Sequence, residues 1–280
     1  PYVQYLLTLQ EGDPIKHILR RVRLVRPFFN LIFTKADHIQ VISNYLGKWA
    51  RAMHYERELS VIPNGVDTEL FSKHISKDER TALRNELGAD VETTILLTTS
   101  RLVSKNGIDD VIRGLVHLGE KGRFVILGTG PDEDMLRNLA RELGVASRID
   151  FRGHVAYELL PKYLKASDIF IRPSRSEGMG NSFIEAMASG VPVVATQEGG
   201  IADFLFDASR NPDIPTTGWA VDKNSPEQIV QVVTEIMSRS DKVFQVTKEA
   251  QRLVRAKYDW VTIASSMETL FSHVPVGGVK

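Results

Sequence analysis

The sequence contains no cysteine, and this absence excludes several kinds of chemistry. Without a single thiol among its 280 residues, the chain can form no disulfide bond, use no thiol nucleophile and bind no metal through cysteine. The same composition fits a reducing compartment, so the sequence predicts a cytoplasmic protein.

Long apolar runs and metal-binding motifs are missing as well. No apolar stretch is long enough to span a bilayer, and no signal-peptide pattern is visible. The seven histidines do not occur in an H-E-x-x-H arrangement, and the acidic residues form no compact D-x-D cluster. We therefore expect no metal site and no other tightly bound cofactor. A G-x-S-x-G elbow is also absent, which argues against acyl transfer.

An excess of one charge is lacking too, because 35 basic residues balance 35 acidic ones. This balance argues against a nucleic-acid-binding protein that works through a broad cationic field. Residues 1–60 are an exception, since they carry nine Lys and Arg against five Asp and Glu, a local charge of +4. An anionic partner surface is expected to meet this part of the chain.

Residues 15–26 have the pattern of a basic amphipathic helix. Apolar side chains recur there at helical spacing, while Lys and Arg largely occupy other faces. Such a helix can lie on an anionic membrane or contact a lipid-linked acceptor, which would place the protein at the inner face of the membrane. The commoner explanation of this pattern is the solvated face of a packed helix, and both explanations remain open.

What the sequence does contain is a regular alternation of strands and helices. With 42% hydrophobic and 25% charged residues, the composition is that of a globular protein with a real core. From Thr93 onwards, short apolar runs separated by helical segments predict a doubly wound α/β sheet. The predicted strands of this sheet are 95–99, 124–127, 149–151, 169–172, 193–195 and 219–221. Earlier strands are predicted at 2–8, 38–42 and 59–62, with a helix through Trp49.

The rest of the chain can be placed around the stretch 174–200. This stretch follows the predicted strand 168–172, passes through a glycine-rich turn, and begins a short helix at about Ser182. The helix ends at Gly190, where positive φ is needed, and the apolar run 191–195 forms the next strand. The pattern thus predicts a loop at the carboxyl end of a parallel strand, where open sheets bind ligands.

Two carboxylates lie within this stretch, Glu177 in the loop and Glu185 on the predicted helix. Backbone N–H groups beside a helix N-terminus form a cradle for phosphate, and nearby carboxylates accept hydrogen bonds from sugar hydroxyls. A phosphorylated sugar would suit both features. A purely structural alternative has equal weight, because Ser182 and Glu185 match the S-x-x-E of a capping box. Gly178 and Gly180 would then only shape the turn.

The run E-G-M-G-N-S-F-I-E-A-M-A-S-G-V-P-V-V-A-T closely resembles the donor-binding signature of family 4 glycosyltransferases. The resemblance implies a retaining transfer reaction and a GT-B fold, in which two Rossmann-like domains face each other across a cleft. It implies that Glu177 is a catalytic residue that contacts the sugar of a nucleotide-sugar, and that Glu185 contacts the ribose. The other donor-binding residues that it implies are Gly178, Met179, Gly180, Asn181 and Ser182.

A second motif, S-R-L-V-S-K-N-G-I-D-D at residues 100–110, follows the first strand of the predicted sheet. Its cations Arg101 and Lys105 are suited to clamp a pyrophosphate and stabilise a leaving nucleoside diphosphate. The alternative is ordinary surface charge. Similar enzymes carry R-L-V-x-x-K-G, with Arg and Lys as a catalytic clamp. Arg101 transfers directly, whereas Lys105 is displaced by one position because Asn106 precedes Gly107.

Two further features have simpler explanations. The G-T-G at residues 128–130 lacks the third glycine of G-x-G-x-x-G, since Glu133 occupies that place, and so it predicts a turn. The resembling family often has G-D-G-P here, so Thr129 is a departure and receives no contact. His154 follows a strand end, and we expect it at the surface or in the core rather than in a metal site.

The resemblance divides the chain into three parts. Residues 1–76 are expected to form the rear part of an acceptor-side N-terminal domain, 77–257 a complete donor-binding domain, and 258–280 a closing helix that returns to the first domain. The family's first strands and their glycine-rich loop have no counterpart before Pro1, so we expect an N-terminally truncated enzyme. Gln10 does not match the histidine often found where this first-domain strand ends, and no acceptor-side catalytic residue is assigned.

The sequence therefore predicts a retaining glycosyltransferase that moves a hexose from a nucleoside diphosphate sugar, such as a UDP-sugar, to an acceptor hydroxyl. The acceptor is a glycolipid, a polysaccharide or a small molecule, and no nucleic-acid partner is expected. Two alternatives remain open: a non-catalytic nucleotide-sugar-binding fragment and a sugar-nucleotide epimerase of similar fold. Uracil and guanine remain open as the base, and the chain is expected to bind donor but to turn over slowly or not at all.

Overall fold

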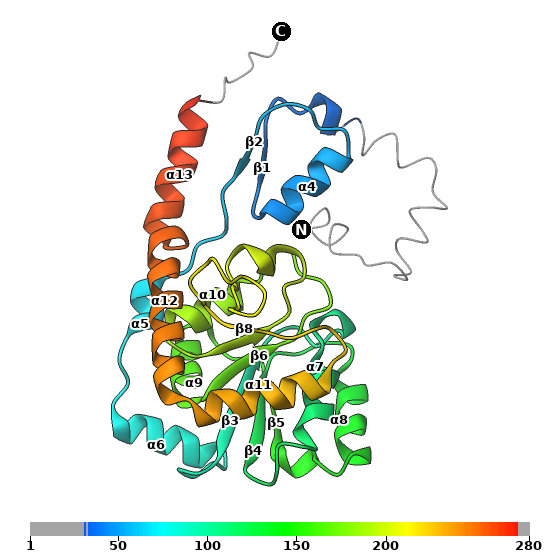
Figure 1. The fold of residues 1–280 in the computed structure, drawn as a ribbon, viewed down its shortest axis with the longest axis vertical. Coiled ribbons are helices and arrows are strands. Elements are labelled where there is room, and N and C mark those ends of the chain that lie inside the picture. The colour runs from blue at the N-terminus through cyan, green and yellow to red at the C-terminus, as the bar shows by residue number, and fades with distance from the viewer. Residues whose placement is uncertain (1–30, 32, 274–280) are drawn as a thin grey trace.

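The computed structural model describes residue 31 and residues 33–273, which fold into two units stacked along the long axis of the molecule (Figure 1). The small unit contains a two-stranded sheet and the large unit a six-stranded sheet. Three sequence predictions lie outside the described residues: the strand at 2–8, the basic helix at 15–26 and the mismatch at Gln10.

The large sheet has the strand order β5-β4-β3-β6-β7-β8, and its neighbouring strands are parallel. Its strands are β3 (Thr94–Thr99), β4 (Gly122–Leu127), β5 (Ile149–Gly153), β6 (Ile169–Arg172), β7 (Val193–Ala195) and β8 (Trp219–Ala220). The predicted doubly wound sheet is therefore confirmed, with small shifts at strand ends. The order reverses between β3 and β6, and such a switch point opens a crevice at the carboxyl ends of the strands.

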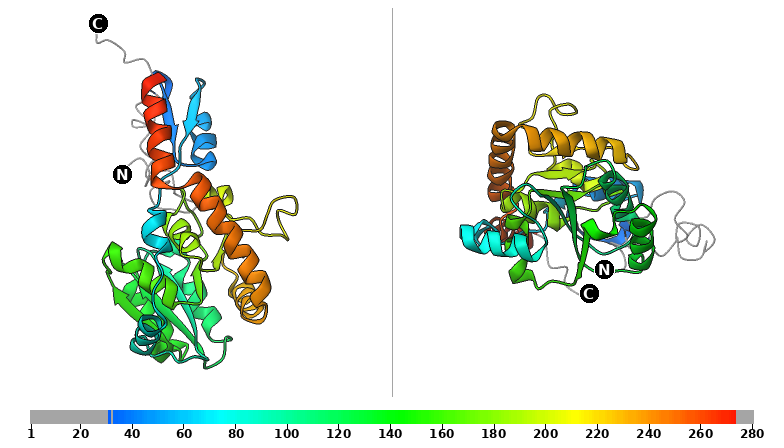
Figure 2. Two further views of the ribbon diagram at one scale, coloured as in Figure 1. Left: turned by 90° about the vertical axis from the view of Figure 1, so that its left-hand side faces the viewer. Right: turned by 90° about the horizontal axis from the view of Figure 1, so that it is seen from below.

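Helices cover both faces of this sheet (Figure 2). They are α6 (Lys77–Glu86), α7 (Ile108–Leu115), α8 (Glu133–Glu142), α9 (Leu160–Ala166), α10 (Asn181–Ala188), α11 (Pro226–Ser238) and α12 (Ser240–Lys257). Residues of α7, α8 and α11 lie in one core, residues of α9 and α10 lie in the other, and α12 contributes to both.

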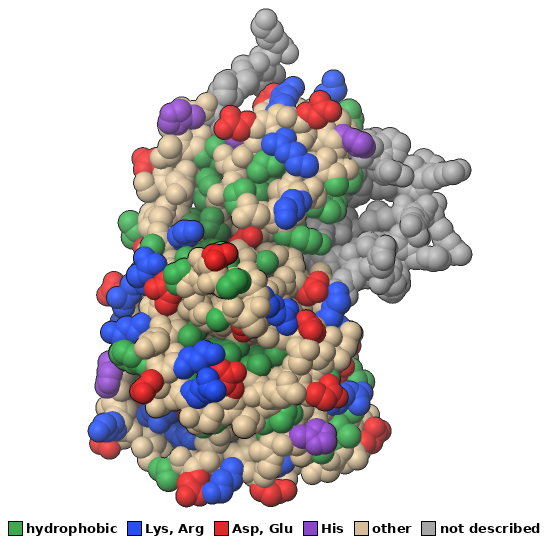
Figure 3. All heavy atoms as spheres, viewed as in Figure 1, with side chains coloured by type: hydrophobic (Ala, Val, Ile, Leu, Met, Phe, Trp, Pro, Cys, Tyr) green, Lys and Arg blue, Asp and Glu red, His purple; other side chains and the backbone are tan. Residues whose placement is uncertain are grey.

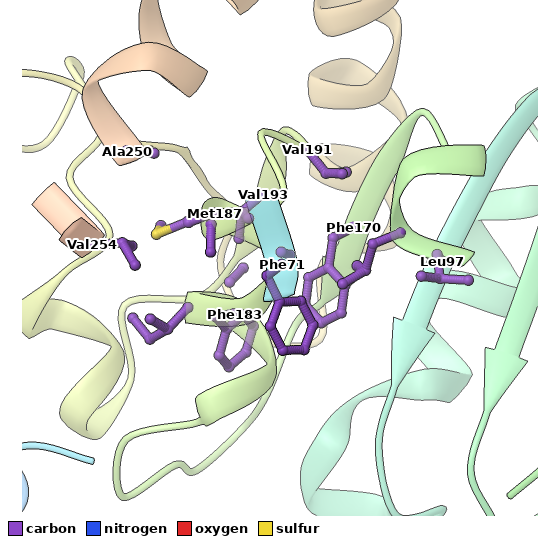
Figure 4. Packing of buried hydrophobic residues seen from close by; sticks show 14 of the residues in the cluster. Phe71, Leu97, Phe170, Phe183, Met187, Val191, Val193, Ala250 and Val254 are labelled. Carbon is purple, nitrogen blue, oxygen red and sulfur yellow. The ribbon is translucent and has the colours of Figure 1, made fainter. Parts of the chain in front are cut away.

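Side chains of the sheet alternate between these two cores, as the pleat of a strand requires. In β3, Ile95 and Leu97 point into one core and Leu96 into the other, and all three are fully buried. Figure 4 shows the first core, where Phe170 of β6 packs edge to face on Phe183 of α10 with ring centres 5.6 Å apart. Because both faces are covered, the strands other than the edge strand β5 read as largely apolar runs in the sequence.

The small unit consists of two parallel strands joined by a helix. Its elements are β1 (Ile39–Val41), α4 (Asn44–Ala52) and β2 (Leu59–Val61). Ser43 caps α4 through its side-chain oxygen, which explains why the helix begins there. Phe33, Ala50 and Tyr55 form a separate small core beneath the strands. The predicted strands at 38–42 and 59–62 are thus confirmed.

The chain crosses between the two units at two adjacent places. After β2 it passes through the irregular segment 63–67, which contains no turn, into α5 (Thr68–Ser72), and it returns at Tyr258 into α13 (Trp260–His273). Val66 joins the two crossings, because its N–H donates to Tyr258 O at 2.8 Å and its carbonyl accepts from Trp260 N–H at 3.2 Å. From this point α13 extends to the level of β1 and β2 (Figure 1).

The predicted domain boundary near Ser76 and the closing helix at 258–280 remain predictions. Helix α5 packs against α9 and α10, and its Phe71 is fully buried in the core of the large unit (Figure 4). This packing favours a boundary before α5 rather than after it.

Candidate active site

A cleft of about 580 Å³ opens at the carboxyl ends of β3, β4 and β5. It is lined by residues 99–101 at the end of β3, residues 127–130 at the end of β4, and His154, Val155, Tyr157 and Leu160 beyond β5. The cleft lies beside the switch point of the sheet, and its volume falls within the range of small-molecule sites.

Backbone segments at the floor of this cleft pack closely. A Cβ atom on Gly128 would lie 1.9 Å from Ser100 O, so only glycine fits at that position. This contact gives the G-T-G motif a structural role, in line with the predicted turn. Neither Thr129 nor His154 is assigned a ligand from its motif, yet both line the cleft. In the sequence, their position directly after strand ends is the signal that indicates residues of a ligand site.

Arg172, the last residue of β6, is a buried cation that precedes the signature stretch and contacts it. Its Nη1 donates to Thr99 O at 3.2 Å and to Ser182 Oγ at 2.8 Å, and its Nη2 donates to Glu177 Oε2 at 2.9 Å. The guanidinium carbon lies 4.2 Å from the centre of the Phe183 ring. The sequence did not indicate a role for this residue, because it belongs to an apolar strand. The signal that could have identified it is a charged residue at the end of the buried run I-F-I-R.

Glu177 lies in the loop between β6 and α10, and its side chain is only 14% exposed. Besides the bond from Arg172, its Oε1 accepts from Gly178 N–H at 2.9 Å. The loop backbone is supported from the chain after β7, because Gly200 N–H donates to Glu177 O at 3.0 Å. A Cβ atom on Gly199 would lie 2.0 Å from that same oxygen. Both the side chain and the backbone of Glu177 are therefore held in one position.

Glu185 is buried on α10, with 9% of its surface exposed. Burial raises the pKa of its carboxyl to about 7, although the nearby Arg172 guanidinium acts in the opposite direction. The capping-box alternative is wrong. Helix α10 begins at Asn181, directly after Gly180, and no side chain caps it. The Ser182 hydroxyl accepts from Arg172 instead, which leaves Glu185 without a capping role.

Tyr157 lines the cleft, and its hydroxyl is affected by the charge of Glu185. Its side chain lines the cleft, and its ring packs edge to face on Phe71 with centres 5.4 Å apart. Burial raises the pKa of the Tyr157 hydroxyl to about 12, and the negative charge of Glu185 adds to this effect. Glu185 therefore acts electrostatically on a residue of the cleft lining.

The loop also contacts the small unit. Asn64 lies in the segment that connects the two units. Its backbone N–H donates to Met179 Sδ at 3.2 Å, and its side-chain amide donates to Asn181 Oδ1 at 3.2 Å. Asn44, at the start of α4, donates its backbone N–H to Asp203 Oδ2 at 2.7 Å. Met179 and Asn181 thus lie where the two units meet.

The two predicted clamp cations differ in their positions. Arg101 is exposed and lines the cleft. Lys105 is half-buried in a 3-10 turn, does not line the cleft, and accepts a hydrogen bond at its carbonyl from Arg175 N–H at 2.7 Å. Asn106, which precedes the glycine of the motif, is buried and donates to Arg101 O at 2.6 Å. The clamp roles of both cations remain predictions.

Arg175 joins the loop after β6 to the loop after β3. Its guanidinium donates to both carboxylate oxygens of Asp109 at 2.9 Å and to Asp110 Oδ2 at 2.8 Å. Burial raises the pKa of Asp110, the charge of Asp109 adds to this, and Arg175 opposes it. A Cβ atom on Gly107 would lie 2.3 Å from Pro173 O, so the two loops also touch through their backbones.

A metal site and a membrane-spanning helix are both absent from the part of the chain that the structure describes. No group of three or more His, Cys, Asp or Glu side chains there is placed to hold a metal ion, and no helix there is long and apolar enough to cross a membrane. On the face shown in Figure 3, basic and acidic side chains are interspersed over the large unit. The predicted membrane contact at 15–26 lies outside the described residues.

Comparison with known families and curated proteins gives clear matches. Residues 79–260, more than half of the chain, match the family model described as "Glycosyl transferases group 1". The chain is 30% identical over 242 residues to the GDP-mannose-dependent alpha-(1-6)-phosphatidylinositol monomannoside mannosyltransferase of Mycobacterium tuberculosis, covering 82% of this chain and 60% of that protein. It is 28% identical over 220 residues to the D-inositol 3-phosphate glycosyltransferase of Xylanimonas cellulosilytica, covering 76% and 51%. The chain thus spans about 60% or less of the length of these relatives.

Comparison with solved structures supports the fold. Anabaena Alr3699/HepE, crystallised with UDP and glucose, matches with a TM-score of 0.79 and 22% identity, covering 89% of this chain and 66% of that one. Sucrose-phosphate synthase from Thermosynechococcus elongatus matches with a TM-score of 0.75 and 24% identity, covering 87% and 59%. These matches confirm the predicted GT-B-like α/β fold.

Proposed function

Because the chain belongs to the family of group 1 glycosyl transferases, we propose that it transfers a hexose from a nucleoside diphosphate sugar to an acceptor hydroxyl and retains the configuration at the anomeric carbon. The observation that carries this proposal is the cleft at the carboxyl ends of β3, β4 and β5, which has an exposed arginine in its lining. The fixed loop with Glu177 follows the neighbouring strand β6.

Each part of this region has a role in the proposed reaction. The cleft would hold the nucleoside, and Arg101, with Lys105 assisting, would stabilise the negative charge that develops on the leaving diphosphate. Backbone N–H groups of residues 179–182 lie at or just before the N-terminus of α10 and would donate to phosphate or sugar oxygens, while the Gly178 N–H already donates to Glu177 Oε1. Glu177 would accept hydrogen bonds from sugar hydroxyls, and Glu185 from the ribose.

GDP-mannose is the donor to test first, because the relative that is 30% identical is named as a GDP-mannose-dependent enzyme. A UDP-sugar is the alternative donor. Both curated relatives are named for a compound that contains inositol. An inositol-bearing glycolipid or inositol phosphate is therefore the first acceptor class to test. A lipid-linked acceptor would bring a cytoplasmic protein to the inner face of the membrane, where residues 15–26 remain the predicted contact.

Transfer and binding have to be measured separately, because a binding fragment and an epimerase are the competing functions. The chain is incubated with radiolabelled GDP-mannose or UDP-glucose, with and without a panel of inositol-bearing and other glycan acceptors. Label in the acceptor supports the proposed transfer. Donor binding without transfer supports the binding fragment, and a changed sugar in the absence of acceptor supports the epimerase.

Replacing Arg101 with alanine should weaken diphosphate binding. A charge-assisted hydrogen bond contributes about 1.5–3 kcal/mol, so the Kd for GDP or UDP should rise roughly tenfold or more. Isothermal titration calorimetry measures this change. Arg141→Ala, at an exposed arginine on α8 outside the cleft lining, is the matched control and should bind as the wild type does. Equal affinities for wild type and Arg101→Ala would remove the clamp assignment.

The two carboxylates should respond differently to loss of charge. Glu185→Gln should weaken GDP and GDP-mannose alike, by about tenfold, since a hydrogen bond from the ribose to a charged group is lost. Glu177→Gln should leave GDP binding unchanged and weaken only GDP-mannose. Calorimetry at pH 8, where Glu185 is ionised, gives both values. If Glu177→Gln weakens GDP as much as the sugar donor, the assignment of Glu177 to the sugar is wrong.

A further inference from the structure

We propose that Arg172 is a positioning residue that fixes the Glu177 carboxylate for the donor sugar. The proposal rests on the proposed function, since it deepens the role of Glu177 in the same site. Its basis is the ion pair between Arg172 Nη2 and Glu177 Oε2 at 2.9 Å, in which the two side chains are only 7% and 14% exposed. A pair this well shielded from solvent keeps its geometry much better than a surface ion pair does.

The guanidinium is itself held from several directions. Nη1 is bonded to the carbonyl of Thr99 on β3 and to the hydroxyl of Ser182 on α10, and the group stacks over Phe183. Space around it is limited as well, because a Cβ atom on Gly180 would lie 2.8 Å from Arg172 Nη2. Arg172 therefore links β3, β6 and α10 to the loop, and it presents one donor to Glu177 in a fixed direction.

Glu177 depends on this donor for its orientation. Within the described residues, its carboxylate has two hydrogen-bond donors, Arg172 and the neighbouring Gly178 N–H. Each oxygen keeps a further lone pair with which to accept a sugar hydroxyl. Without Arg172, the carboxylate would lose its charged partner and could rotate, and binding a sugar would then have to order it first.

The charge of Arg172 reaches the second carboxylate too. The guanidinium lowers the pKa of Glu185, against the larger effect of burial, and both carboxylates favour the charged form of Arg172. One buried cation thus pairs with one acid of the signature and interacts electrostatically with the other. A neutral residue at position 172 should therefore affect the sugar end of the donor first, through the direct bond to Glu177.

The test compares a sugar donor with its free nucleotide. Calorimetry on the full chain gives the ratio of the Kd for GDP-mannose to the Kd for GDP, and the same ratio for UDP-glucose and UDP. Arg172→Met should raise the ratio by about tenfold for the pair that the wild type binds, while the Kd for free nucleotide changes by about twofold at most. Arg172→Lys keeps the charge but has a single donor group, so it should give an intermediate ratio. This variant takes the place of Arg172→Met in the test if Arg172→Met does not fold.

A double-mutant cycle with Glu177→Gln separates positioning from simple destabilisation. If Arg172 acts through Glu177, adding Arg172→Met to Glu177→Gln should change nothing, so the double variant should have the same ratio as Glu177→Gln alone. The matched control is Arg84→Met, since Arg84 is also buried and pairs with Asp168 at 2.9 Å, next to the opposite end of β6. This control should lower stability and leave the ratio unchanged.

Three results would overturn the inference: an unchanged ratio in both Arg172 variants, additive effects in the double variant, or an equal change in Arg84→Met. A wild-type chain that binds none of the four nucleotides would overturn the proposed function and this inference together. Binding by the wild type with an unchanged ratio in the Arg172 variants would overturn only the inference.

Discussion

Replacing Glu185 with glutamine should raise the unfolding temperature of the ligand-free protein by about 5–10 °C at pH 8, and by at most a few degrees at pH 5. The reason is that burial raises the pKa of this carboxyl to about 7 from its ordinary value of 4.5. A carboxyl with a raised pKa contributes stability that is fully present below pH 4.5 and is lost as the pH rises through about 7. Above that pH, the ionised carboxylate costs about 3 kcal/mol, which glutamine avoids.

Thermal unfolding followed by circular dichroism between pH 5 and pH 8 measures this effect. Glu142→Gln, at an exposed carboxylate on the last turn of α8, is the control, and it should give the same small shift at every pH. A uniform loss of stability in Glu185→Gln would contradict the prediction. The same variant is expected to bind nucleotide more weakly. If it is also more stable, the Glu185 carboxylate destabilises the empty site although binding requires it.

Replacing Gly199 with alanine should destabilise the protein by about 3 kcal/mol or more. Gly199 has a φ of 64°, a left-handed conformation that costs a residue with a side chain about 1 kcal/mol. The new Cβ atom would also lie 2.0 Å from Glu177 O, a backbone atom, so the signature loop has to move. We therefore expect GDP-mannose binding to weaken along with stability.

Gly144 provides a matched control for this substitution. Its φ of 71° is nearly the same, but no atom lies within 4 Å of the position that a Cβ would occupy. Gly144→Ala should thus cost about 1 kcal/mol and leave donor binding unchanged. Urea unfolding gives both stabilities. Equal losses in the two variants would show that the loop tolerates the displacement at Gly199.

The sheet was predictable from the sequence because its strands, except the edge strand β5, are largely buried on both faces. Such strands read as short apolar runs, and the glycines and charged segments between them mark the turns and helices. The loop after β6 was predictable for the same reason, since it follows the run at 169–172 and precedes a helix that ends before Gly190. Local patterns were sufficient for these elements.

The interactions inside the site were not predictable, because they join residues that are far apart in the sequence. The S-x-x-E pattern at Ser182 left a capping box open as an alternative, yet the Ser182 hydroxyl bonds to Arg172, and the helix begins after Gly180 instead. The support of Glu177 by Gly200 crosses an intervening helix and strand. No periodicity records such contacts, and only the positions of residues at strand ends hint at them.

The pair of crossings at Val66 and Tyr258 has a consequence for how this architecture can change. The polypeptide enters the large unit and leaves it at one point, so the unit has the topology of a segment inserted into the small one. Adjacent chain ends are the condition under which domains tolerate insertion and circular permutation. A chimaera that takes 67–257 from a relative has to rebuild one junction, together with the contacts of Asn44 and Asn64. We therefore expect that the large unit can be exchanged as a cassette while the small unit stays as it is.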